Sequence, residues 1–151
     1  MKIWIYLIFI TFLPGIELRG SIPIAILYYK ENILLSFVII TLVNILLIPI
    51  VFLLWHYILI LAEKIPFIKR YLDNIQGRAR RFIDKYGFLG LMLFVAIPLP
   101  GTGAYTGAFA AEIFKMNKKK AFIAVAMGVI IAAVIVTLAS AGVISIKIIG
   151  R

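Results

Sequence analysis

Two short stretches of this chain hold residues that could do chemistry. The first, ELRG at residues 17–20, places Glu17 two positions before Arg19. A glutamate can take and release a proton, and the guanidinium of Arg19 can hold a phosphate through two parallel hydrogen bonds. The alternatives are a structural ion pair that fixes the local fold, or a position of both residues at a membrane surface.

The second stretch, PLPGTGAYTG at residues 98–107, combines helix-breaking prolines and glycines with hydroxyl groups. A helix that begins after such a break exposes backbone amides at its positive dipole end, where an anion is favoured. Alternatively, the small residues let two helices approach closely, and the two roles can coexist. The candidate residues are Pro98, Pro100, Gly101, Thr102, Gly103, Tyr105 and Thr106.

Three weaker candidates lie outside these stretches. Asn44, in the middle of an apolar run, could bond to a helix break or to a neighbouring helix. His56 is more typical of an interfacial anchor than of a proton relay. Glu112 lies in a lysine-rich segment, and we expect a solvated ion pair with Lys115 or Lys118.

The residue inventory excludes several kinds of active site. The chain has no cysteine and a single histidine, which leaves no thiolate or histidine cluster for zinc or iron. Neither a nucleophile with its base nor a phosphate-binding P-loop occurs in the sequence. We therefore expect no enzyme activity, no metal and no cofactor.

Composition indicates an integral membrane protein. Of the 151 residues, 64% are hydrophobic, and the mean hydropathy of +1.13 is far above that of soluble domains. The net charge of +10 comes from basic residues beside apolar runs. We interpret these residues as topology signals and contacts for anionic lipid headgroups, and we expect no nucleic-acid partner.

Two uncharged runs are long enough to cross a bilayer. Residues 32–62 and 121–146 carry no formal charge, and each exceeds the roughly 20 residues that a helix needs to span the hydrocarbon core. We expect both to be transmembrane helices of a multi-pass protein in the cell (plasma) membrane.

A third uncharged run, residues 86–111, lies between two basic segments, 63–85 and 112–120. Because cytoplasmic loops carry an excess of basic residues, both segments should lie in the cytoplasm. The run between them then forms a re-entrant hairpin that turns at residues 98–103. Residues 63–85 would form a basic loop or a surface-lying amphipathic helix.

The N-terminal half repeats this plan. Leu-Pro-Gly at residues 13–15 recurs at 99–101, and we expect a hairpin whose tip lies near residues 14–19, entering from outside. Units 1–62 and 86–151 then each comprise a re-entrant helical hairpin and one transmembrane helix. The predicted fold is an all-α integral membrane protein, a single domain built as an inverted repeat. Both termini would lie outside.

The motifs ELRGSIPIA (17–25) and PLPGTGAYTG (98–107) together resemble the putative small multidrug export protein family, which is related to the DedA and VTT-domain (SNARE-associated) membrane proteins. The resemblance implies two re-entrant hairpins packed together, with an acidic and a basic residue at their centre. By matching position, the hairpin residues are Glu17, Arg19 and Pro23 in the first, and Pro98, Pro100, Gly101, Thr102 and Gly103 in the second.

For the DedA relatives, the resemblance implies transbilayer movement of lipids, including polyprenyl-phosphate carriers. These relatives carry an arginine-containing motif in their second hairpin, whereas this chain has no charge between Tyr86 and Ala111.

Three functional hypotheses follow. The first is a flippase or scramblase that binds a phosphate-bearing lipid through Arg19 and the amides after Pro100. The second is a proton-coupled exporter of small amphiphilic compounds, in which Glu17 exchanges a proton for substrate. The third is a membrane scaffold that transports nothing. The expected partners are a lipid or amphiphile, protons and a second copy of the chain in a homodimer.

Overall fold

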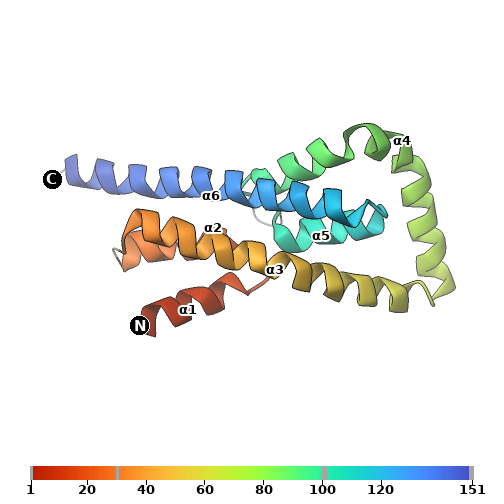
Figure 1. The fold of residues 1–151 in the computed structure, drawn as a ribbon, viewed down its shortest axis with the longest axis horizontal. Coiled ribbons are helices and arrows are strands. Elements are labelled where there is room, and N and C mark those ends of the chain that lie inside the picture. The colour runs from red at the N-terminus through yellow and green to blue at the C-terminus, as the bar shows by residue number, and fades with distance from the viewer. Residues whose placement is uncertain (1, 30, 100–101, 150–151) are drawn as a thin grey trace.

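The computed structural model describes residues 2–29, 31–99 and 102–149, so Pro100 and Gly101 lie outside the described residues (Figure 1). Every secondary-structure element in the described residues is a helix, which confirms the predicted all-α class. The elements are α1 (Lys2–Thr11), α2 (Glu17–Pro23), the π-helix η1 (Ile24–Tyr28), α3 (Ile33–Ala62), α4 (Pro66–Ala96), α5 (Ala104–Ile113) and α6 (Lys118–Ile149).

Among the described residues, two helices are long and apolar enough to cross a membrane, namely Ile33–Ala62 and Lys118–Val143. They overlap the predicted spans, 32–62 and 121–146, over most of their length. A side chain stabilises each start: Asn32 Oδ1 accepts a hydrogen bond from the Leu35 amide at 3.1 Å, and Asn117 Oδ1 accepts one from the Lys119 amide at 3.1 Å. Asparagine at this position satisfies amides that have no partner within the helix.

Each half of the chain contains a helical hairpin beside its long helix. In the first, α1 packs on α2, and the connection contains Gly15 with a φ of +88°. In the second, the end of α4 packs on α5, and residues 97–99 and 102–103 between them are not helical. The break that we predicted at residues 98–103 is therefore present. The first tip differs from the prediction, because Glu17 already begins α2 and the connection is residues 12–16.

The two hairpins extend toward each other from opposite ends of the molecule (Figure 1). The start of α1 and the end of α6 lie at one end. The first part of α4 runs across the other end, and its apolar last part, Lys85–Ala96, turns back beside α6. The basic segment that we predicted as a loop or a surface helix is thus helical from Pro66 onward.

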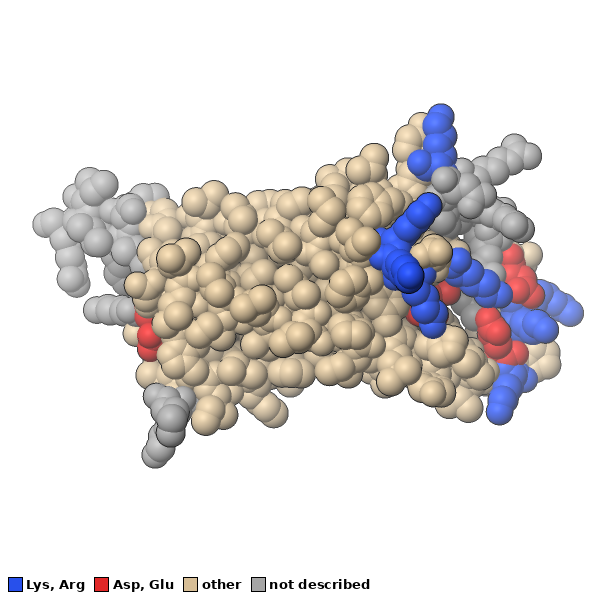
Figure 2. Space-filling model, in the orientation of Figure 1, with Lys and Arg blue, Asp and Glu red and all other residues tan. Residues whose placement is uncertain are grey.

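Charge separates along the same axis. On the face shown in Figure 2, lysines and arginines gather at the α4 end, and the long middle part shows no charged side chain. This pattern suits a molecule whose middle lies in hydrocarbon and whose α4 end lies at a headgroup surface.

Small residues let the second hairpin and α6 approach closely. A Cβ added to Gly128 would lie 2.7 Å from the Met92 carbonyl oxygen, and one added to Gly107 would lie 2.5 Å from Val95 Cγ2. The buried surfaces nearby are also rich in alanine, as at Ala108 and Ala124. Such packing replaces the hydrophobic driving force that is missing between helices in lipid.

Candidate functional site

The tips of the two hairpins meet at Glu17. Its side chain is buried, with the residue 3% exposed, and its carboxylate accepts hydrogen bonds from the backbone amides of Ala104 (3.0 Å) and Tyr105 (3.2 Å). These amides open α5, where the helix dipole favours negative charge. The sequence predicted an anion at this point, and the anion in the structure is the chain's own carboxylate. Binding of a substrate anion there stays a prediction.

Gly103 is required by this contact. A Cβ at this position would lie 2.6 Å from Oε1 of Glu17 and 2.7 Å from its Cδ, and still closer to Oε2. Glu17 itself has a φ of +45°, which non-glycine residues rarely adopt. The hydrogen bonds to α5 hold it in this conformation, so both sides of the contact have fixed geometry.

Arg19 binds the other side of the second break. Its Nη2 donates to the carbonyl oxygens of Val95 (3.1 Å) and Ile97 (3.3 Å), at the C-terminal end of α4. A cation is favoured at the negative end of a helix dipole. Thus Glu17 caps the start of α5 while Arg19 caps the end of α4. No hydrogen bond or ion pair joins these two side chains among the described residues, and the buried Nε of Arg19 has no partner there.

The hydroxyls of the second tip stabilise its turn. Thr102 Oγ1 lies 2.6 Å from the Ile97 carbonyl oxygen and 2.9 Å from that of Leu99. Thr106 Oγ1 accepts a hydrogen bond from the Gly103 amide at 2.8 Å. Both threonine hydroxyls among the candidate ligand donors therefore have partners within the turn. Pro98 lies half-buried in the same segment.

Tyr105 ties α5 to the first hairpin and to α3. Its hydroxyl donates to the Phe12 carbonyl oxygen at 2.7 Å, and its own carbonyl accepts from the indole nitrogen of Trp55 at 3.0 Å. The Trp55 ring also packs against Phe109, with 4.4 Å between ring centroids. Sequence reasoning did not assign Trp55 to the site. The one indication in the sequence was the indole N–H of Trp55, because a buried indole N–H needs a hydrogen-bond acceptor.

Two candidates do not join this network. Asn44 is fully buried, but neither its Oδ1 nor its Nδ2 has a hydrogen-bond partner in the described structure. Neither of the two bonds that we considered for Asn44, to a hairpin tip or to a neighbouring helix, is therefore formed among the described residues. Pro23 ends α2, where the helix widens into η1, and it acts on backbone geometry because it lacks an N–H.

Glu112 is placed differently from our expectation. Glu112 Oε1 lies 3.6 Å from Nζ of Lys118, one of the two predicted partners. The Glu112 side chain, however, is only 11% exposed. Its other oxygen lies 3.4 Å from Nδ1 of His56. Lys115 pairs instead with Glu63, at 3.9 Å. In the predicted solvated pair, Lys118 is exposed but Glu112 is largely buried, because α5 places Glu112 against the end of α3.

Comparison with protein families places this arrangement in context. The family described as "Putative small multi-drug export protein" matches residues 17–135, a segment that begins at Glu17 and includes both hairpin tips. No curated protein matches the chain, and no solved structure does.

Proposed function

The chain belongs to the putative small multi-drug export protein family, and we propose that it is a plasma-membrane transporter that moves phosphate-bearing lipids between the two leaflets. In this proposal α3 and α6 span the bilayer. The two hairpins are re-entrant, enter from opposite faces and form an inverted repeat. Lipid moves past their meeting point while its tails remain in the hydrocarbon.

The binding of the Glu17 carboxylate by the first amides of α5 carries the proposal. A phosphate presents the same anionic oxygens to the same donors. Protonation of Glu17 would weaken its hold on the amides, and a phosphate could then replace it. Arg19 supports the exchange, because its buried Nε has no partner among the described residues and is available to the incoming anion.

The proposed orientation rests on charge. The α4 end carries the lysines and arginines visible in Figure 2, and basic residues favour the cytoplasmic side. There they would also gather anionic lipids. Both termini would then face outside, since the start of α1 and the end of α6 lie at the opposite end of the molecule.

A second candidate function is proton-coupled export of small amphiphilic compounds. The family's description favours it, as does the burial of Glu17, which at 3% is the least exposed acidic residue among the described residues. A third candidate, a scaffold that transports nothing, is supported by the internal hydrogen bonds of Thr102 and Thr106.

Reconstituted liposomes can separate these functions. The purified protein is tested for transbilayer movement of fluorescent polyprenyl phosphate and glycerophospholipid, alongside Arg19→Ala and Glu17→Gln. Matched controls are Arg70→Ala, an exposed arginine, and Glu31→Gln, a carboxylate outside the tips. We expect the parent and both controls to accelerate lipid movement and both tip variants to lose it.

Other outcomes assign the other functions. If the parent moves no lipid but releases amphiphiles when a pH gradient is imposed, and Glu17→Gln does not, the exporter replaces the lipid translocator. If neither tip substitution changes any movement, the scaffold is favoured.

A further inference from the structure

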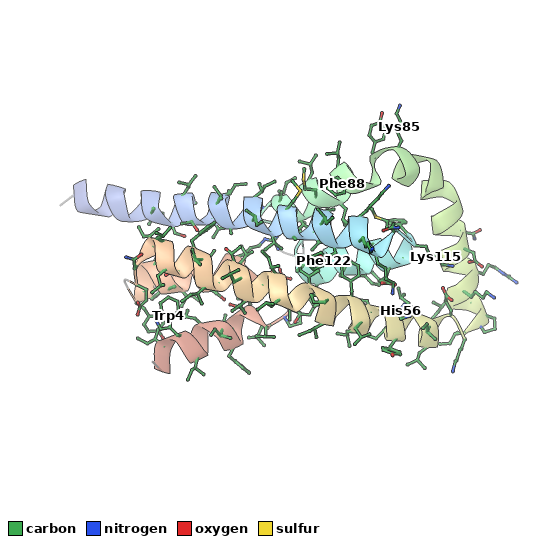
Figure 3. All side chains as sticks on the ribbon, in the orientation of Figure 1. Trp4, His56, Lys85, Phe88, Lys115 and Phe122 are labelled. Carbon is green, nitrogen blue, oxygen red and sulfur yellow. The ribbon has the colours of Figure 1, made fainter. Side chains whose placement is uncertain are left out.

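A cavity of about 340 Å³ lies at the basic end, at the opposite end of α5 from the hairpin tips. It is bounded by the end of α3, the end of α5 and the start of α6. Its apolar wall comprises Leu59, Ile60, Ile113 and Met116. Figure 3 labels His56 and Lys115, which line it, at this end of the molecule. The volume falls within the range of small-molecule sites.

Glu112 has unused hydrogen-bonding capacity in this cavity. Its Oε1 is buried and has no hydrogen-bond partner among the described residues. The Lys118 ammonium lies 3.6 Å away, which allows charge attraction but is longer than a hydrogen bond. A buried carboxylate oxygen without a donor is unfavourable, so a ligand that supplies an N–H would satisfy it.

Lys115 adopts an unusual backbone conformation beside the cavity. Its φ is +49°, and it follows Phe114, the residue that caps the C-terminal end of α5. Glycine is favoured at this position because other residues are strained there. The Lys115 side chain is 63% exposed and lies 3.9 Å from Glu63. Its ammonium therefore has hydrogen-bonding capacity left, which indicates a use for lysine where glycine would be more stable.

We propose that this cavity binds a zwitterionic head group that joins a primary ammonium to a phosphate through a short link, as phosphoethanolamine does. The ammonium donates to Glu112, and the phosphate lies between Lys115 and Lys118. The apolar wall receives the start of the acyl chains. Two carboxylates and two lysines line the cavity, so a ligand with no net charge matches it better than an anion or a cation.

This inference rests on the proposed function, because it names a lipid class and the place where its head group is held before reaching the tips. It also distinguishes three head groups. Phosphatidylcholine carries the same charges as phosphatidylethanolamine but has no N–H to donate to Glu112. Phosphatidylglycerol carries no ammonium, and its negative charge would meet Glu63 and Glu112.

Lipid binding to the purified full-length protein tests the proposal. Native mass spectrometry measures binding of the three lipids with identical acyl chains. We expect phosphatidylethanolamine to bind about tenfold more tightly than phosphatidylcholine, the difference that a hydrogen bond to a charged group supplies. Soluble O-phosphoethanolamine is added as a competitor. If O-phosphoethanolamine displaces the lipid, the head group alone is sufficient for binding. If the lipid stays bound in its presence, the ligand of the cavity is the intact lipid.

Two variants and a control identify the cavity as the site. Glu112→Gln should reduce the preference for ethanolamine over choline. Lys115→Gly removes the ammonium but relieves the strained backbone, so it should fold at least as well as the parent and bind less lipid. Lys119→Ala removes a neighbouring exposed lysine that does not line the cavity, and it should bind as the parent does.

Equal binding of the ethanolamine and choline lipids would overturn the proposal, as would an unchanged preference in Glu112→Gln or unchanged lipid binding in Lys115→Gly. These results are separable from the proposed function. Loss of lipid movement in Arg19→Ala with the ethanolamine preference intact supports both inferences. Polyprenyl-phosphate movement without any ethanolamine preference retains the transport proposal and overturns this one.

Discussion

The two ends of α5 each hold a carboxylate, but by different means. At its start, Glu17 accepts two backbone hydrogen bonds at 3.0 and 3.2 Å. Near its end, Glu112 lies 3.4 Å from His56 and 3.6 Å from Lys118, with one oxygen lacking a hydrogen bond in the described structure. Backbone amides have a fixed position, whereas lysine and histidine side chains can move. The first contact is therefore a rigid junction and the second an adjustable one.

This difference predicts unequal consequences for similar substitutions. Disturbing the rigid junction leaves helix-end amides and a buried charge without partners, which is costly. At the adjustable end the side chains can rearrange or reach water. Substitutions near Glu17 should thus affect stability more than substitutions near Glu112.

Gly103→Ala should have the largest effect. The new methyl group would overlap the Glu17 carboxylate, so either the tip shifts or the carboxylate leaves the α5 amides. We expect a loss of about 3 kcal/mol in unfolding free energy, combining overpacking with a poorly paired buried charge. Denaturant unfolding in detergent, followed by circular dichroism, measures it.

Gly142→Ala is the matched control, because a Cβ there meets nothing within 4 Å. It should be neutral or slightly stabilising, since alanine favours a helix over glycine. Equal stability of Gly103→Ala and Gly142→Ala would mean that the two tips are not in rigid contact.

Glu17→Gln should have the next largest effect. Glutamine keeps one acceptor oxygen but loses the charge that the α5 dipole favours. We expect a loss of about 2 kcal/mol, the value of a hydrogen bond to a charged group. The same unfolding assay checks it, with Glu31→Gln as the control. A loss no larger than in that control would show that the carboxylate charge does not stabilise the junction.

Much of the fold was predictable because its signals are local. Uncharged runs of sufficient length predicted α3 and α6, and prolines with glycines predicted the break before α5. Each of these features depends on residues close together in the sequence. That the start of α5 can attract an anion was also predictable, because any helix start presents unpaired amides, whereas its occupation by the chain's own Glu17 was not predicted.

The partners at the site were not predictable in the same way. The Ala104 amide and Glu17 are separated by 87 positions, and nothing local to either motif specifies that they meet. Similarly, the contact between Arg19 and the α4 carbonyls depends on how the hairpins face each other. A lysine-rich sequence such as the one around Glu112 predicts an exposed segment. The Glu112 side chain is largely buried only because α5 packs against α3.

Asn44→Leu should have a small effect of opposite sign. Both polar atoms of Asn44 are buried without a partner in the described structure, so replacement with an apolar side chain removes a desolvation cost. We expect a gain of up to about 1 kcal/mol. Thr11→Val is the comparison. The buried Thr11 hydroxyl is hydrogen-bonded to Leu7 and Ser21, so its removal should lower the unfolding free energy. A clear loss of stability in Asn44→Leu would reveal a partner for Asn44 within the bilayer.

The smallest effect on folding is expected for Glu112→Gln. Glu112 lies 3.4 Å from Nδ1 of His56 and 3.6 Å from the Lys118 ammonium, at or beyond the limit of a hydrogen bond. Both partner side chains reach solvent, with His56 41% and Lys118 66% accessible. Such pairs contribute about 0–1 kcal/mol and weaken with salt. Unfolding at low and high ionic strength should therefore show a small loss at low salt that disappears at high salt. A loss as large as that of Glu17→Gln would contradict the contrast between the two ends of α5, because it would make the adjustable end as rigid as the junction.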